Sequence, residues 1–174
     1  MAFSIATLAR IAFGPPPEVV CSADVWNKGV LELRKRTLGG SRESGAFLLG
    51  SKAGPTRRIE EFVFYDDIDP TSLSTGIVVI DGRRLGALWT HCRKMGREVV
   101  ADIHVHPGGF QQSRSDKANP VMAEIGHVAM ILPDYAARAT RPGGIGVFEY
   151  KGSRQWRDRS AETPSPFHVG WWPK

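Results

Sequence analysis

Two histidines and an aspartate in the middle of the chain have the residue types and the spacing of a metal site. His104 and His106 end an apolar stretch, and Asp116 follows a loop rich in glycine and glutamine. Side chains two apart on a strand share a face and lie roughly 6–7 Å apart, so both imidazoles can tilt onto one ion. Two histidines and one carboxylate form a recurring catalytic zinc set that leaves a fourth position for water. The alternative is that all three are ordinary surface residues.

The loop after the histidines carries a second pattern, which needs no metal. Ser113 and Asp116 stand three apart, as in a capping box at the start of a helix. In that motif each side chain accepts a hydrogen bond from the backbone N–H of the other residue. On these residues alone, a helix cap and a metal ligand are both open for Asp116.

Hydrolysis at such a site also needs a carboxylate that takes a proton from water and returns it to the leaving amine. Glu43 is the candidate, because it precedes an apolar run at 46–49 that predicts a buried strand. It also stands near Gly45, where a backbone can approach a site closely. The alternative for Glu43 is an ordinary solvated glutamate.

Two further ionisable residues are of interest near the histidines. Asp102 shares the strand face of His104 by alternation and could orient an imidazole, although a plain structural role is equally open. His127 begins another predicted strand, and there a structural role is favoured.

The hydrophobic pattern predicts an α+β domain around these residues. Helical spacing predicts helices over 23–38, 82–94 and 120–125. Apolar or alternating runs predict strands over 19–21, 46–49, 58–65, 77–80, 99–105, 127–132 and 145–150. Residues 1–13 fit either an edge strand or a short helix. Helices and strands mix without strict alternation, which favours one mixed central sheet flanked by helices.

Composition excludes several classes of protein. The chain has 174 residues and a net charge of +5, which suits one domain, and its basic residues are scattered rather than interleaved with aromatic ones. No run approaches the roughly 20 apolar residues of a membrane span, and residues 1–13 lack a signal-peptide pattern. Cys21 and Cys92 make no disulfide framework, which favours a reducing compartment. We expect a cytoplasmic protein with no nucleic-acid or membrane partner.

Taken together, three motifs resemble the JAB/MPN family of metalloproteases with its JAMM motif. The family pattern is a glutamate before an apolar strand flanked by glycines, then His-x-His-Pro, then Ser-x-x-Asp. The matching segments here are 43–50 (ESGAFLLG), 104–107 (HVHP) and 113–116 (SRSD). The likeness covers roughly residues 19–150 in element order. One departure is that six residues separate His106 from Ser113, where the family usually has seven.

The resemblance implies a role for each motif residue. His104, His106 and Asp116 would bind Zn²⁺, which lowers the pKa of a bound water and polarises the scissile carbonyl. Glu43 would be the general base and then the general acid. Ser113 would donate a hydrogen bond to the developing oxyanion.

The resemblance also implies the domain layout. We expect a single MPN/JAB domain over residues 1–158, with the cytidine-deaminase-like α/β sandwich of that family and a core at about 19–150. Residues 159–174 would form an aromatic tail, in which we expect Trp171 and Trp172 to pack on the domain.

Members of the family cleave isopeptide or peptide bonds after the C-terminal tail of ubiquitin or ubiquitin-like proteins. Loops 66–74 and 133–144, where the family carries substrate-facing insertions, are short here. This resembles prokaryotic members, whose partners are ubiquitin-like proteins, their conjugates, and ubiquitin-activating or ubiquitin-conjugating homologues. We expect a zinc isopeptidase of this kind. A zinc peptidase or amidase acting on a small peptide or sulfur-carrier conjugate and a non-catalytic MPN scaffold are the alternatives, although scaffold members lack the ligands that this chain has.

Overall fold

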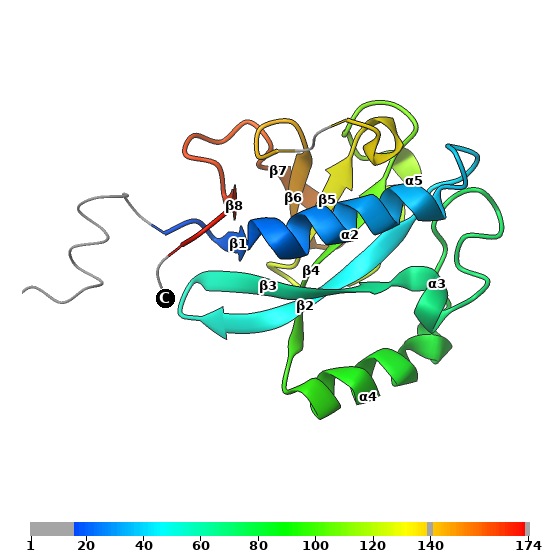
Figure 1. The fold of residues 1–174 in the computed structure, drawn as a ribbon, viewed down its shortest axis with the longest axis horizontal. Helices are drawn as coiled ribbons and strands as arrows, with labels where there is room; N and C mark the ends of the chain where they lie inside the picture. The colour runs from blue at the N-terminus through cyan, green and yellow to red at the C-terminus, as the bar shows by residue number, and fades with distance from the viewer. Residues whose placement is uncertain (1–15, 139–140, 173–174) are drawn as a thin grey trace, which may run out of the picture.

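The apolar runs of the chain pair into one curled, eight-stranded mixed sheet (Figure 1). The computed structural model describes residues 16–138 and 141–172. The strands are β1 (Val19–Cys21), β2 (Gly45–Ala53), β3 (Thr56–Phe64), β4 (Glu98–Val105), β5 (Val128–Leu132), β6 (Gly146–Gly152), β7 (Gln155–Asp158) and β8 (Phe167–Val169). Their order in the sheet is β7-β6-β5-β4-β2-β3-β1-β8. The predicted fold class, a single mixed sheet flanked by helices, is confirmed.

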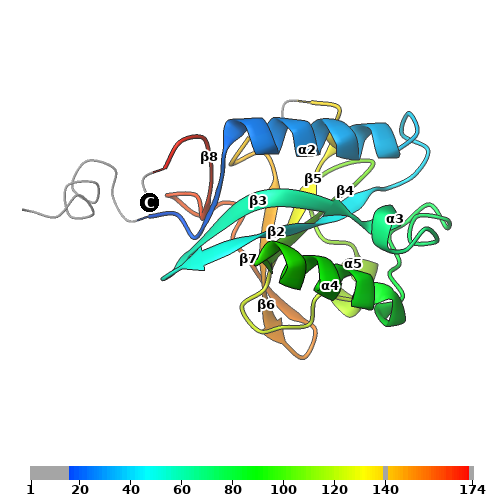
Figure 2. The ribbon, with the colours of Figure 1, turned by 60° about the horizontal axis from the view of Figure 1, so that its bottom comes forward.

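Helices lie on both faces of this sheet, with α2 on one side and α4 on the other (Figure 2). The helical elements are α2 (Ala23–Arg36), α3 (Tyr65–Ile68), η1 (Gly82–Leu85), α4 (Gly86–Met95), α5 (Arg114–Ala118) and η2 (Asp134–Ala136). Ser22 caps α2 by accepting a hydrogen bond from the backbone N–H of Val25, as its residue type favours. Helix α2 then buries Trp26 and Leu33 against the sheet.

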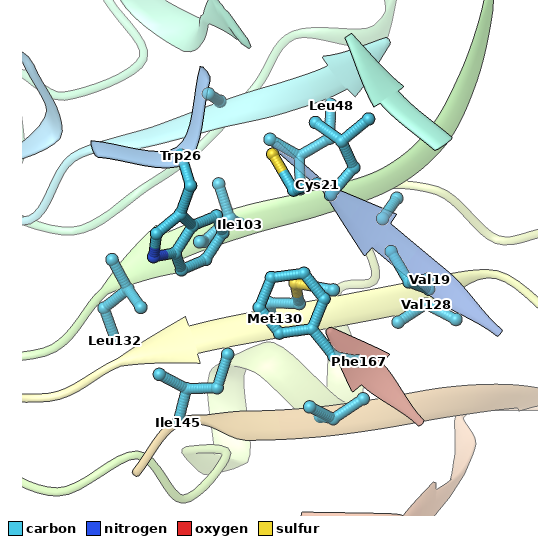
Figure 3. Close-up of a cluster of buried hydrophobic side chains, with 14 of the residues drawn as sticks. Val19, Cys21, Trp26, Leu48, Ile103, Val128, Met130, Leu132, Ile145 and Phe167 are labelled. Atoms are coloured by element: carbon cyan, nitrogen blue, oxygen red, sulfur yellow. The ribbon is translucent and has the colours of Figure 1, made fainter. Parts of the chain in front are cut away.

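The core consists of two apolar clusters. The larger one is rich in β-branched and aromatic side chains, which suit a pleated, half-buried surface. Figure 3 shows it gathering Trp26 of α2, Ile103 of β4, Met130 of β5 and Phe167 of β8. The smaller cluster includes Phe47 and Leu49 of β2 and Leu88 and Cys92 of α4. Strands β2 and β4 are thereby covered from both sides.

Strand β4 lies in the middle of the sheet. It pairs antiparallel with β2, where Gly45 lies opposite His104, and parallel with β5, where Ile131 lies opposite His104. Beyond the end of the strand, the backbone N–H of His106 still donates to the carbonyl of Leu132 at 2.9 Å. The two histidines are therefore held on a backbone that is bonded on both sides.

Two predicted elements are wrong. Residues 77–80 form no strand in the described structure, because this extended segment has no neighbouring strand to pair with. Residues 120–125 form bends and turns rather than a helix. The helix of this region, α5, comes earlier and ends at Ala118, with Asn119 as its C-cap just before Pro120. A proline at that position stops a preceding helix as readily as it starts a new one.

The part of the chain predicted as a tail contributes to the sheet. Strand β8 pairs parallel with β1, and Phe167 is buried in the larger cluster. Trp172 packs edge-on against His168, with ring centroids 5.1 Å apart. Trp171 is 75% exposed, so its expected packing on the domain is wrong. The segment 1–13, predicted as an edge strand or a short helix, lies outside the described residues.

Among the helices of the described ranges, none combines the length and the apolar character needed to cross a membrane.

Candidate metal centre

Three predicted ligands meet at the carboxyl end of β4. The Nε2 atoms of His104 and His106 lie 2.9 Å apart. The Asp116 carboxylate lies 3.6 Å from Nε2 of His104 through Oδ1 and 3.2 Å from Nε2 of His106 through Oδ2. Both histidines are 7% exposed. The alternative of three separate surface residues is therefore wrong.

The spacing of the three donor atoms suits a tetrahedral metal ion. Ligand bonds of about 2.0–2.1 Å in tetrahedral geometry hold donor atoms about 3.3 Å apart. The two Nε2 atoms lie 2.9 Å apart, and one ligand atom from each of the three residues lies within 4.8 Å of the others. Two imidazoles and one carboxylate are also a donor set that zinc accepts. The cluster can hold a metal ion, and zinc as its identity stays a prediction.

Asp116 reaches the histidines from the first turn of α5. The side chain of Ser113 accepts a hydrogen bond from the backbone N–H of Asp116 at 3.1 Å, and Oδ2 of Asp116 accepts one from the backbone N–H of Ser113 at 2.6 Å. These two bonds make a full capping box. The two patterns seen in the sequence thus coexist, because the cap fixes the carboxylate while its oxygens still face the imidazoles.

The Ser113 hydroxyl keeps a donor after making this cap. A hydroxyl carries one donor and two acceptor lone pairs, and Ser113 uses an acceptor for the cap. The residue is exposed to solvent. Donation to an oxyanion, as the resemblance implies, is compatible with this geometry and stays a prediction.

Glu43 stands beside the ligand cluster. Its Oε1 lies 4.0 Å from Nε2 of His106, and Oε2 accepts a hydrogen bond from the backbone N–H of Val78 at 3.4 Å. The backbone N–H of Glu43 donates to the carbonyl of Gly76 at 2.9 Å. The structure therefore brings Glu43 to the site rather than leaving it solvated. The contacts to residues 76–78 were not foreseen, since that segment was predicted to join the sheet as a strand.

Gly45 is needed for close packing next to the site. A Cβ atom at this position would lie 2.3 Å from the ring of Tyr65 and 2.8 Å from the carbonyl oxygen of Ile103. Both distances are far below van der Waals contact, so no other residue fits without a shift of the backbone. The backbone at Gly45 thus comes close to Tyr65 and to β4, and its predicted close approach to the site itself stays a prediction.

A left-handed turn clamps the loop that follows His106. Asp134, Tyr135 and Ala136 have φ angles of 53°, 52° and 56°. Each such non-glycine residue costs about 1–2 kcal/mol. The turn donates a hydrogen bond from Tyr135 N–H to the carbonyl of His106 and another from Asp134 N–H to the carbonyl of Gly108, both at 2.8 Å. The strain is thus stored where the backbone of a candidate ligand is held.

The charges of the cluster shift two pKa values in opposite directions. Burial by itself lowers the pKa of His104, but its hydrogen bond with Asp116 and the nearby charges of Asp116, Asp102 and Glu43 raise it overall. Burial by itself raises the pKa of Asp116, but hydrogen bonds with His104 and His106 hold it well below its usual range.

Asp102 contacts neither histidine of the cluster. Its carboxylate instead bonds to His127 of the turn before β5 and to Tyr65 at the start of α3. A direct hydrogen bond that orients an imidazole, which alternation left open for Asp102, is absent from the described contacts.

No family model matches the chain. A Sinorhizobium fredii protein named "Probable metalloprotease y4jG" is 24% identical over 104 residues, which cover 57% of this chain and 64% of that protein. The chain thus matches somewhat less than two thirds of the length of this relative. The similarity is thus a distant one, to a protein named as a probable metalloprotease.

Two solved structures share the fold. The solution structure of protein DSY2949 from Desulfitobacterium hafniense aligns with a TM-score of 0.62 and 16% identity over 87% of this chain and 92% of that one. A protein from Salinibacter ruber aligns with a TM-score of 0.52 and 16% identity over 79% of this chain and 86% of that one. Both support the α+β architecture.

The shifted pKa values predict a pH window for the metal-free protein. The raised pKa of His104 means that its contribution to stability is full below the ordinary value of 6.5 and is lost as pH rises through the raised pKa. The lowered pKa of Asp116 means that its contribution is full above 3.8 and is lost as pH falls through the lowered pKa. Both contributions to stability are therefore full between about pH 4 and 6.5.

Urea denaturation in EDTA tests this window. We expect the difference in free energy of unfolding between the wild type and Asp116→Asn to be largest in that range and to shrink on either side. A difference that stays constant from about pH 3 to 9 would contradict the ion pair.

Proposed function

We propose that this chain is a zinc-dependent metalloprotease of the JAMM type, which cleaves a peptide or isopeptide bond after the C-terminal tail of a ubiquitin-like protein. The observation that carries the proposal is the meeting of His104, His106 and Asp116 with Glu43 at their side. The similarity to the Sinorhizobium fredii protein supports a peptidase, and the three sequence motifs support this type of peptidase.

Each residue of the cluster has one task in this proposal. Zinc held by His104, His106 and Asp116 supplies a Lewis acid, which lowers the pKa of a water molecule toward neutrality and polarises the scissile carbonyl. Glu43 takes a proton from the attacking water and returns it to the leaving amine. The N–H of Val78 holds the Glu43 carboxylate in place for both transfers.

Ser113 completes the chemistry in the proposal. In the proposal, the hydroxyl proton that the cap leaves unused is donated to the oxygen that becomes negative when water attacks the carbonyl. One such donor is worth about 2.7–4 kcal/mol in a hydrolase where it has been measured. The capping bond from Asp116 limits the motion of the Ser113 side chain, which reduces the reorganisation needed at that step.

The segment 77–80 supports an extended substrate. Val78 and Ile80 pack inward on the smaller apolar cluster, whereas Ile77 and Val79 are 46% and 55% exposed. This alternation is that of a strand, and the segment follows Gly76, whose carbonyl is bonded to Glu43. The backbone N–H groups of Val78 and Val79 already donate, to Glu43 and to the carbonyl of Ser72, so an extended tail would lie against the outward side chains of this segment and pass beside Glu43. The flexible C-terminal tail of a ubiquitin-like protein suits that mode.

The short loops 66–74 and 133–144 support a compact prokaryotic enzyme that works beside ubiquitin-activating and ubiquitin-conjugating homologues. In the described structure the first of these loops is tied down, since Asp69 is buried and accepts hydrogen bonds from Thr71 and Asp81. Neither loop is long enough to select among chain types on its own.

The metal is tested first. We expect the native chain, purified without chelator, to carry about one zinc ion by native mass spectrometry, and His106→Ala to carry none under the same conditions. EDTA should abolish cleavage and zinc should restore it. A wild-type chain that binds no metal at micromolar zinc would overturn the proposed function.

The general base is tested with Glu43→Gln. We expect kcat to fall by about 100- to 10,000-fold on a ubiquitin-like protein fused through its C-terminal glycine to a reporter, because no group remains to accept the proton. Zinc content should not change. The matched control is Glu124→Gln, since Glu124 is exposed and away from the ligands.

Two outcomes would redirect the proposal. Cleavage that Glu43→Gln leaves intact would sink the assignment of the base. Activity on short peptide amides alone, with none on the fused protein, would favour the small-conjugate peptidase instead.

The substrate strand is tested by replacing both outward side chains of the segment. We expect the double variant Ile77→Ser with Val79→Ser to lower kcat/KM on the protein substrate by roughly 2- to 30-fold, mainly through KM, because two cross-strand contacts are lost. Its kcat on a short peptide amide should stay near that of the wild type. The control is Leu31→Ser, because Leu31 is an exposed leucine on α2, outside the segment 77–80. Equal effects on both substrates would argue against strand addition.

A further inference from the structure

The face of the sheet that carries the candidate ligands continues into the interior with an acidic residue. On β4 the alternation places Asp102 on the same face as His104. On the neighbouring strand β2, Gly45 lies opposite His104 and Phe47 lies opposite Asp102. Asp102, His104 and Asp116 also line one small cavity. Going inward along this face of β4, the candidate ligand His104 is therefore followed directly by the carboxylate of Asp102.

Asp102 is almost fully buried and both its oxygens are engaged. It is 2% exposed, and its partners His127 and Tyr65 are 5% and 0% exposed. Nε2 of His127 lies 2.6 Å from Oδ1, and the Tyr65 hydroxyl donates to Oδ2 at 3.0 Å. Each oxygen of Asp102 thus has one fixed partner.

A cluster of this kind is an expensive way to fill an interior. Burial of a carboxylate costs several kcal/mol, and replacing a buried polar cluster by apolar side chains of similar size is often neutral or stabilising. The neighbouring interior positions of β4, namely Val100, Ala101, Ile103 and Val105, are all apolar. Stability of the fold alone therefore gives no reason for Asp102 at this position, and its closeness to His104 gives one.

Tyr65 connects this cluster to the strand that leads to Glu43. Its ring lies against Gly45 so closely that a Cβ there would be 2.3 Å away, and it packs edge-on against Phe47 with centroids 4.9 Å apart. Its hydroxyl then bonds to Asp102 on β4. One side chain thus braces β2, two residues after Glu43, against β4, two residues before His104.

We propose that Asp102, held by His127 and Tyr65, is a positioning residue for the metal site: through Tyr65 it ties the part of β4 that carries His104 to the part of β2 that follows Glu43. Histidine ligands are commonly oriented by a carboxylate, a carbonyl or a water behind them, and loss of that support weakens metal binding. Here the support is indirect, because the carboxylate acts through the backbone of β4 and through the Tyr65 side chain. The inference rests on the proposed zinc function.

The test compares zinc affinity of folded variants by competition with a chromophoric chelator. We expect Asp102→Asn to bind zinc about 10- to 100-fold more weakly than the wild type. The amide keeps the size of the side chain but offers only one oxygen to two partners. Tyr65→Phe, which removes a single hydroxyl, should weaken binding in the same direction by a smaller factor. This second variant carries the test if Asp102→Asn does not fold.

The control separates positioning from mere stability. Ile59→Val removes one methylene from the larger cluster, on strand β3. We expect Ile59→Val to lower the unfolding temperature without changing zinc affinity. If the role of Asp102 were purely structural, Asp102→Asn would behave in the same way. Wild-type zinc affinity in both Asp102→Asn and Tyr65→Phe would overturn this inference and leave the proposed function standing. A wild-type chain that binds no zinc would overturn both.

Discussion

The pairing of β2 with β4 is the constraint on which the candidate site depends. Because Gly45 lies opposite His104, the residue two positions earlier, Glu43, comes to the same face beside His106. A slip of one residue would turn the glutamate to the opposite face of the sheet. The irregularity in this ladder lies between Leu48 and Leu49, toward the other end of the strands, so the pairing next to the site is regular.

The second element of the site depends on the first for its stability. Helix α5 has only five residues, which is too short to form by itself. The capping box of Ser113 and Asp116 and the contacts between Asp116 and the two histidines hold it in place. The Asp116 carboxylate therefore takes part in both the capping box and the contacts with the two histidines. An ion bound there would stabilise the helix and the cap together.

The two faces of the central strands differ in chemistry. The face toward α2 carries the larger apolar cluster, with Ile103 and Val105 of β4. The opposite face carries His104 and Asp102 among the apolar residues of β2 and α4. Buried polar groups need partners with good geometry, and the Tyr65 hydroxyl and His127 supply them for Asp102 on this face. The apolar face supplies the stability, and the polar face is organised around the candidate site.

Periodicity and residue type alone determined much of this protein. The helix at 23–36, the central strand ending in two histidines, and the pattern of glutamate, histidines, serine and aspartate could all be read from the chain, because amphipathic spacing and donor chemistry are local properties. Only the tertiary structure decided what residues 77–80 do, since a strand pattern needs a neighbour before it becomes a strand. It also decided that Asp116 is both cap and potential ligand, and that Asp102 bonds to His127 and Tyr65. Those partners are distant along the chain, and only pairing of the strands brings such residues within hydrogen-bond reach.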